Sequence, residues 1–452
     1  MIIQTNYLKE NNNFDYIIIG GGPAGTTLAN KLDKNKNILI VEAGDGIPGF
    51  AKANNPSSTV NDFYYQNTSN LYPIESSRIS ALGGGSQYWA DNKLGYNNTI
   101  YPKRSEKFTQ ELINHENKVI EIDQINFTEI NHYSAEYFYE DLKSIINKKN
   151  TKIILNSRFI NLNYDNENES ATSINIKTGT NNLKVFGKFF IICTGGIESA
   201  KILLNEKKNN KKLDSFLNYF SFSDDFGLNT GSLIISNKNK LFHKLNKKLG
   251  NHKYMYLNGD NHKKAIFNFK ESSYEINNFF EHSLMQIANM KLKDHFIDSY
   301  YKFCKRFDKC EFIGSKIRGT FSNFLKANVS LNGTYDEDKV ENINLEYNYD
   351  NILNELKDYI INFGSLIESS GIGYISIKNE IMEGDMNYFK NNIDWGHHHC
   401  FNFEENLFFD HNKKIKPFKN IFLNSTMTQT PNFTPTIYLF GESIKLARYL
   451  NS

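Results

Sequence analysis

A glycine cluster at residues 20–25, with the sequence GGGPAG, constrains the possible folds of this chain more than any other feature. It follows an apolar run at residues 16–19, YIII, whose length and composition are typical of a buried parallel strand. Small and apolar residues at 24–32 indicate a helix, and a second apolar run at 38–41 indicates another strand. A strand, a helix and a strand in succession predict a βαβ unit and therefore an α/β domain.

The cluster satisfies the pattern G-x-G-x-x-G, and the chemistry of a dinucleotide site explains each glycine. Gly20 permits a tight turn after the strand, Gly22 lets the backbone approach a pyrophosphate, and Gly25 lets helix and strand pack closely. The phosphates would lie at the helix N-terminus, beside Pro23 and Ala24, where free N–H groups and the helix dipole favour negative charge. The alternative is a plain glycine-rich turn, which would need neither the strand before it nor the helix after it.

An acidic residue completes the predicted dinucleotide site. Glu42, followed by Ala43, ends the second strand and is placed to accept hydrogen bonds from ribose hydroxyls. The motif alone does not separate FAD from NAD. Its position near the start of a long chain favours FAD.

Charge and cysteine usage narrow the possible partners and the compartment. Lys and Arg number 52 against 50 Asp and Glu, so no global basic field would recruit nucleic acid or an anionic membrane. The four cysteines form no CxxC pair, which is typical of a reducing compartment. The first residues are polar, and no apolar run is long enough to span a membrane. We therefore expect a cytoplasmic protein without a membrane span.

Three further segments, taken with the first, resemble the glucose-methanol-choline (GMC) oxidoreductase family. Residues 78–89, RISALGGGSQYW, resemble the family's R-x-x-x-L-G-G-x-S stretch, which lies along the pyrophosphate and the flavin. Residues 190–200, FIICTGGIESA, resemble its strand–A-G-x-I-E-S/T–helix element. Residues 420–437 resemble its ending, N-L-Y-V-x-D-x-S followed by N-P-T-x-T-I. The segments occur in the family's order.

The resemblance implies an FAD site spread over the whole chain. The FAD would be bound non-covalently, because no histidine occurs between Gly83 and Asn92. The helix after Thr434-Pro435 would direct its first backbone N–H groups toward the flavin and stabilise negative charge there. The candidate cofactor-binding residues are Gly20, Gly22, Pro23, Ala24, Gly25, Glu42, Ala43, Arg78, Gly83, Gly84, Gly85, Ser86, Trp89, Phe159, Thr194, Gly195, Asn424, Thr436 and Ile437.

The resemblance also implies a catalytic histidine. The family carries its base in a segment of the type H-x-x-G-T, and residues 395–400, WGHHHC, occupy the corresponding place. His397 is the base if Cys400 replaces the family's glycine, and a shift of one residue makes it His398. We prefer His397. Histidine suits the task because its pKa lies near neutrality.

Two other interpretations of the histidines stay open, and two positions depart from the family. Alternate histidines on one face of a strand can bind metal, but no carboxylate or cysteine spacing completes such a site, so we expect no metal; a purely structural role is the other possibility. Thr434 stands where the family has Asn or His as a second catalytic residue, and Asn424 stands where it has Asp. These departures leave room for a dehydrogenase, a specialised substrate or a weakened enzyme.

The predicted architecture combines a Rossmann-like FAD-binding domain from discontinuous segments with an α+β substrate domain on an antiparallel sheet. The FAD domain would comprise residues 14–205 and 396–452, and the substrate domain residues 206–395. Residues 334–350 are predicted to be a loop with strand edges. The implied reaction is oxidation of a CH–OH group, in a sugar or sugar derivative, by hydride transfer to flavin N5 and on to an unidentified electron acceptor. The alternatives are a redox-neutral sugar mutase, an amine oxidase, or a catalytically weakened flavin-binding protein.

Overall fold

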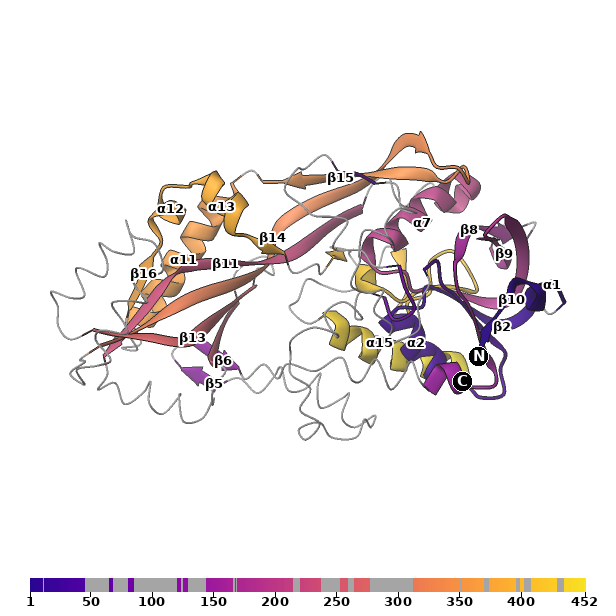
Figure 1. The fold of residues 1–452 in the computed structure, drawn as a ribbon, viewed down its shortest axis with the longest axis horizontal. Coiled ribbons are helices and arrows are strands. Elements are labelled where there is room, and N and C mark those ends of the chain that lie inside the picture. The colour runs from indigo at the N-terminus through magenta and orange to yellow at the C-terminus, as the bar shows by residue number, and fades with distance from the viewer. Residues whose placement is uncertain are drawn as a thin grey trace.

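The structure is a computed structural model, and two sheets dominate the part of the chain that it describes (Figure 1). It describes residues 1–10, 12–44, 65–67, 80–84, 120–122, 125–128, 144–165, 167, 169–213, 220–236, 253–258, 264–276, 312–349, 351–369, 374–395, 399–401, 408–428 and 435–452.

The first sheet contains the predicted βαβ unit. Its strand order is β1-β7-β3-β2-β10-β9-β8, and β19 pairs with the end of β10. The strands are β1 (Ile2–Ile3), β2 (Asn13–Ile19), β3 (Ile38–Val41), β7 (Thr151–Ile154), β8 (Ser157–Tyr164), β9 (Ala171–Thr178), β10 (Asn181–Ile192) and β19 (Ile421–Leu423). Strands β1, β7, β3, β2, β10 and β19 pair in parallel, whereas β8, β9 and the first half of β10 pair antiparallel. The βαβ prediction is confirmed.

Helices cover both faces of this sheet, which explains why its parallel strands are continuous apolar runs. Helix α2 (Pro23–Lys31) and helix α15 (Pro435–Asn451) pack on one face, with Ile18 of β2. Helix α7 (Gly196–Asn209) packs on the other face, with Ile17 and Ile19. Successive residues of a strand point to opposite faces, so each must be apolar when both faces are buried. The short helix α1 (Thr5–Glu10) lies near β10.

The second sheet is antiparallel apart from one edge pair. Its order is β16-β11-β14-β13-β12-β6-β5, with β17 and β18 also on β11, and β15 between β14 and β4. The strands are β4 (Tyr65–Asn67), β5 (Ile120–Ile122), β6 (Ile125–Thr128), β11 (Phe220–Ser236), β12 (Lys253–Asn258), β13 (Lys264–Ile276), β14 (Phe312–Tyr335), β15 (Glu341–Asn348), β16 (Tyr374–Ile377), β17 (Asp394–Trp395) and β18 (Cys400–Phe401). Helices α11 (Ile352–Ser369), α12 (Asn379–Met382) and α13 (Met386–Asn392) accompany it (Figure 1). The fold is therefore mixed α/β, with one mainly parallel and one antiparallel sheet.

The predicted loop with strand edges at residues 334–350 is shorter than expected, because most of the segment belongs to the strands of a β-hairpin. Strands β14 and β15 continue up to a tight turn at residues 336–340. Asp336 closes that turn, since its Oδ1 accepts the backbone N–H groups of Asp338 and Val340, each at 3.0 Å. The many Asn and Asp residues suggested a loop, but Ile343 and Leu345 anchor β15 in the core.

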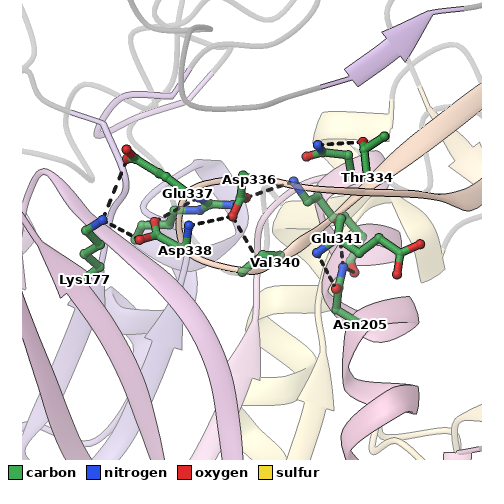
Figure 2. A network of polar contacts seen from close by, with 11 residues as sticks. Lys177, Asn205, Thr334, Asp336, Glu337, Asp338, Val340 and Glu341 are labelled. Carbon is green, nitrogen blue, oxygen red and sulfur yellow. Dashed lines mark hydrogen bonds and ion pairs between the residues drawn. The ribbon is translucent and has the colours of Figure 1, made fainter.

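The tip of this hairpin joins the second sheet to the first through ion pairs (Figure 2). The guanidinium of Arg158, on β8, pairs with Asp336 and lies 3.2 Å from Asp338. Lys177, on β9, also pairs with Asp338. Lys201 Nζ, on α7, lies 3.9 Å from the fully buried side chain of Asp336. We call this cluster the hairpin contact.

Asp336→Asn tests the hairpin contact. We expect it to lower the free energy of unfolding by about 3 kcal/mol, because it removes the buried carboxylate that faces Arg158 and Lys201. The amide oxygen can still accept the two N–H groups of the turn, so the loss reports the missing charge. Urea unfolding measures it. The control is Glu337→Gln in the same turn, where the side chain is 76% exposed and the change should stay below about 0.5 kcal/mol. Equal losses in both variants would contradict this account.

A buried carboxylate also fixes α7 against β8. Glu206 accepts the backbone N–H of Leu162 through Oε1 and the hydroxyl of Tyr164 through Oε2, both at 2.8 Å. Burial raises the pKa of Glu206 to about 7, because desolvation of the charged form outweighs these hydrogen bonds.

The pKa of Glu206 predicts how stability depends on pH. The folded state holds its proton more tightly than the unfolded chain, so this contribution is complete below the ordinary pKa of 4.5 and is lost as the pH rises through about 7. Between pH 5 and 8, the unfolding free energy of the wild-type protein should fall by more than that of Glu206→Gln. We expect this difference to be roughly 3 kcal/mol at most. Urea unfolding across that range measures it. Glu169→Gln is the control, because Lys212 and Lys419 lower the pKa of Glu169 to about 2, outside the range. An unchanged slope in Glu206→Gln would sink the prediction.

Candidate dinucleotide site

The turn between β2 and α2 closes against the two strands that flank β2. The Gly20 N–H donates to the carbonyl of Val41, at the end of β3, at 2.8 Å. Gly20 has a φ of 101°, and a Cβ atom there would lie 2.6 Å from the carbonyl oxygen of Cys193, at the end of β10. Only glycine fits both conditions. The carboxyl ends of β3, β2 and β10 therefore meet at this turn, which is where parallel sheets bind ligands.

Gly25 and Gly22 have opposite surroundings. A Cβ atom at Gly25 would lie 2.1 Å from the carbonyl oxygen of Gly20, so α2 approaches β2 more closely than any side chain allows. A Cβ atom at Gly22 would meet no atom of the described residues within 4 Å. Gly22 is the N-cap of α2, and no side chain caps that helix. Open space therefore lies at a helix N-terminus with free N–H groups, as an approaching phosphate requires.

Glu42 ties the end of β3 to the glycine turn. Its Oε2 accepts the Gly21 N–H at 2.7 Å, and its Oε1 accepts the Gly44 N–H at 2.8 Å. The residue is 6% exposed, and burial raises its pKa above the ordinary value despite these bonds. Ala43, beside it, is partly buried. The predicted contact of Glu42 with a ribose stays a prediction.

Residues 80–84 lie directly against the glycine turn. The Gly83 N–H donates to the carbonyl of Gly21 at 2.8 Å. Gly84 has a φ of 58°, and a Cβ atom there would lie 3.2 Å from the Cα of Gly22. The structure thus brings these two predicted segments together. Four predicted members of the second segment lie outside the described residues, namely Arg78, Gly85, Ser86 and Trp89.

The third predicted segment meets the same turn at the end of β10. The Cys193 N–H donates to the carbonyl of Ile19 at 2.7 Å, and the hydroxyls of Thr194 and Ser199 lie 3.1 Å apart. Gly195 is the N-cap of α7 and has a φ of 76°, and no atom in the part of the chain that the structure describes lies within 4 Å of its Cβ position. A second helix N-terminus with open space therefore lies next to the first. Phe159, by contrast, lies on β8 and packs partly buried against the core.

Asn424 connects the C-terminal segment to this site. It is fully buried, and its backbone N–H donates to the carbonyl of Ile192, at the end of β10, at 2.9 Å. Its Nδ2 donates to the hydroxyl of Ser443, on α15, at 2.8 Å, and that hydroxyl lies 3.2 Å from the carbonyl of Ala24. Helix α15 begins at Pro435 as predicted, so Thr436 and Ile437 form its first turn.

The three predicted catalytic residues, His397, His398 and Thr434, lie outside the described residues. The neighbouring His399 is described: its Nε2 lies 3.9 Å from Oδ2 of Asp224, and its ring packs edge-to-face on Phe222. Sequence analysis did not single out Asp224. The available signal was a pair of acids at 224–225 that interrupts the Phe/Ser alternation at the start of β11.

Metal coordination and membrane crossing find no support in the described ranges. No group of three or more His, Cys, Asp or Glu residues there is arranged to hold a metal ion. In the same ranges, no helix has both the length and the apolar character that crossing a membrane requires.

Comparison with known proteins gives short sequence matches and a fold. No family model matches the chain. A pyranose dehydrogenase from Agaricus xanthodermus is 32% identical over 138 residues, which cover 23% of this chain and 23% of that protein. An oxygen-dependent choline dehydrogenase from Staphylococcus haemolyticus is 31% identical over 119 residues, which cover 22% of this chain and 21% of that protein. The chain thus matches less than a quarter of the length of these curated relatives.

Two solved structures extend the likeness to nearly the whole chain. Pyridoxine 4-oxidase from Mesorbium loti has a TM-score of 0.53 and 14% identity, over 97% of this chain and 99% of that one. Formate oxidase from Aspergillus oryzae has a TM-score of 0.52 and 14% identity, over 97% and 98%. At this identity the likeness shows the fold alone.

Two substitutions distinguish a glycine that helix packing requires, Gly25, from a glycine that lies beside open space, Gly22. We expect Gly25→Ala to lower the free energy of unfolding by about 2–3 kcal/mol, because α2 must move away from β2. Gly22→Ala should cost less than about 1 kcal/mol, because its φ of −72° suits alanine and its Cβ position is open. Thermal unfolding without added cofactor measures both variants. Similar losses would contradict the assignment of these two roles.

Proposed function

We propose that this chain is an FAD-dependent oxidoreductase that oxidises a CH–OH group, since it is similar to pyranose and choline dehydrogenases and shares its fold with pyridoxine 4-oxidase and formate oxidase, which are GMC oxidoreductases. The resemblance inferred from the sequence is thereby confirmed. The observation that carries the proposal is the meeting of three distant segments, at residues 20–25, 80–84 and 193–195, beside two uncapped helix N-termini.

The described residues fit FAD. The open positions at Gly22 and Gly195 lie at the start of α2 and α7, where backbone N–H groups and helix dipoles favour a pyrophosphate. Gly83 and Gly84 let a further backbone segment pass close to the same space. Bound FAD would be held non-covalently and would supply the hydride acceptor at flavin N5. The other candidate cofactor-binding residues named from the sequence complete the proposed FAD site.

The chain's own residues would supply the acid–base chemistry. His397, or alternatively His398, would accept the hydroxyl proton of the substrate. Thr434 would donate a hydrogen bond to the substrate oxygen. Backbone N–H groups of Thr436 and Ile437, at the start of α15, would stabilise negative charge on the reduced cofactor.

The departure at Asn424 does not count against catalysis. Its amide donates to Ser443 and so holds α15 against the carboxyl end of β10 and the first turn of α2. An aspartate at this position would need Ser443 to donate instead, so Asn and Asp can fulfil the same structural role with a reversed hydrogen bond. Thr434 remains the departure that leaves room for a dehydrogenase, a specialised substrate or a weakened enzyme.

The proposed domain division assigns residues 14–205 and 396–452 to the FAD domain and residues 206–395 to the substrate domain. Most strands of the first sheet come from the former ranges, and the longest strands of the second sheet come from the latter. Strands β4, β5, β6 and β18 are excursions from the FAD ranges into the second sheet.

A sugar or sugar derivative is the proposed substrate, supported by the match to a pyranose dehydrogenase. Other relatives and neighbours are named for choline, pyridoxine and formate, and both dehydrogenases and oxidases occur among them. The electron acceptor is therefore left open. We also propose a cytoplasmic location, which rests on the four cysteines of the sequence and the absence of a CxxC pair among them.

Anaerobic bleaching of flavin absorbance tests the proposal. We expect the purified protein to carry FAD, and one class among sugars, polyols and simple alcohols to bleach it. Admission of oxygen then distinguishes an oxidase from a dehydrogenase. Flavin that nothing bleaches would favour a mutase or a weakened flavin-binding protein, bleaching by amines alone would favour an amine oxidase, and a protein unable to take up FAD would refute the proposal.

Histidine substitutions identify the base. We expect His397→Gln to slow flavin reduction by roughly 10²–10⁴-fold while FAD stays bound, because the hydroxyl proton loses its acceptor. If the alignment with the family shifts by one residue, His398→Gln should show this slower flavin reduction instead. The control is His411→Gln, at an exposed histidine of the turn between residues 409 and 415. Normal reduction in both His397 and His398 variants would contradict the mechanism.

A further inference from the structure

Helix α7 connects the candidate cofactor site with the β14–β15 hairpin of the second sheet. The N-terminus of α7, at Gly195, is one of the two open helix N-termini of the candidate site. Further along, the helix contacts β8 of the first sheet and both strands of the hairpin. Its apolar residues lie in the core beneath it, and they are Ile197, Ala200, Leu203 and Leu204. The position of α7 is therefore set by both sheets.

The side chain of Asn205, on α7, binds both backbone groups of Glu341, the first residue of β15. Its Oδ1 accepts the Glu341 N–H at 2.9 Å, and its Nδ2 donates to the Glu341 carbonyl at 3.0 Å (Figure 2). One amide thus replaces the backbone of a neighbouring strand, and both distances are those of well-formed hydrogen bonds. The Nδ2 group also donates to the carbonyl of Lys201, one turn earlier, which orients the amide.

Ion pairs lie on both sides of Asn205 on the same face of α7. Residues 201, 205 and 208 share this face, because the spacings of four and three residues correspond to one helical turn each. Lys208 pairs with the carboxylate of Glu341, and Lys201 Nζ lies 3.9 Å from the carboxylate of Asp336. These pairs attract the hairpin, whereas the two directional bonds of Asn205 fix where it lies along the helix.

The contact at Asn205 affects the far end of the helix because α7 is rigid. Gly195 and Asn205 are ten residues apart, or about 15 Å along the axis. A shift of the helix at Asn205 therefore shifts the free N–H groups near Gly195, and hydrogen bonds from these groups to a phosphate require short distances. On the side of the first sheet, Glu206 holds the same part of α7 by accepting the Leu162 N–H at 2.8 Å. Asn205 provides the corresponding directional contact to the second sheet.

We propose that Asn205 and Glu341 position α7 for FAD, so that seating of the hairpin on α7 and binding of FAD favour each other. The inference rests on the proposed function and adds two positioning residues to it. With the hairpin seated, the first N–H groups of α7 are held where the pyrophosphate would accept them. Because the coupling of two binding events is reciprocal, bound FAD must strengthen the Asn205–Glu341 contact by the factor by which that contact strengthens FAD binding.

Asn205→Ala tests the effect of the contact on the cofactor. The dissociation constant of FAD is measured by dilution of the FAD-loaded protein, well below its unfolding temperature, from the fluorescence of released FAD. We expect this constant to rise about fivefold or more, because α7 loses its directional contact with the hairpin.

Asn420→Ala is the matched control for this measurement. Asn420 binds the backbone of Ala171 in the same way, with its Oδ1 accepting the N–H at 2.9 Å and its Nδ2 donating to the carbonyl at 2.8 Å. That contact lies within the first sheet, away from α7, so the dissociation constant should stay within about twofold of the wild-type value.

The two variants separate positioning from a merely structural role. A structural role would lower the unfolding midpoint of Asn205→Ala and leave the dissociation constant of the folded protein unchanged. That result overturns the proposal, and so does an equal rise of the constant in Asn420→Ala. Failure of the wild-type protein to bind FAD would instead refute the proposed function, so the two failures are distinguishable.

Amide hydrogen exchange tests the reciprocal effect in the wild-type protein, and it stays decisive if Asn205→Ala does not fold. The N–H groups of Glu341 and Ala171 each donate to an asparagine Oδ1 at 2.9 Å. We expect FAD to slow exchange at Glu341 about fivefold or more relative to its effect at Ala171. General stabilisation by the ligand would slow both, or Ala171 of the first sheet more. Either of these outcomes overturns the coupling.

Discussion

The close approach of α2 to β2 is the constraint on which the rest of the molecule depends. At Gly25 the helix lies so near the strand that a methyl group would overlap the carbonyl oxygen of Gly20. Because α2 lies this close to the sheet, its N-terminus is next to the carboxyl ends of β3, β2 and β10. The glycines of residues 83–84 and the start of α7 then reach the same space, and α15 packs on α2 through Ser443.

Burial of charge explains how the two sheets hold one relative position. Apolar packing is tolerant of small shifts, whereas buried ionic groups are costly unless each faces its partner. Asp336, at the tip of the β14–β15 hairpin, enters a site formed by Arg158 on β8 and Lys201 on α7. This contact joins an acid of the second sheet to two bases of the first sheet and its covering helix. It therefore restricts the orientation of the two sheets.

The pattern of neighbouring residues predicted the strands that are apolar on both faces and the start of the C-terminal helix. The apolar runs at 16–19 and 38–41 are buried on both faces, and the helix after Pro435 begins where proline suits a first turn. The pattern failed where polar residues serve tertiary contacts. Asp336 does lie in a turn, but its partners on β8 and α7 are far away in the sequence, so the pattern gave no sign of its tertiary contact. Asp224 gave only a weak signal for the same reason.

The sequence by itself determined the βαβ unit, the glycine positions of the candidate site and the resemblance to the GMC family, because strand period, helix period and glycine sterics act over neighbouring residues. Only the tertiary structure decided which glycine is a packing requirement and which leaves open space, since Gly25 and Gly22 differ in what other segments bring near them. It likewise decided that Glu42 binds two backbone N–H groups and that His399 faces Asp224. The Glu42–Gly21 and Asp224–His399 contacts join residues that the chain separates by 21 and 175 positions, and a one-dimensional pattern carries no record of their proximity in space.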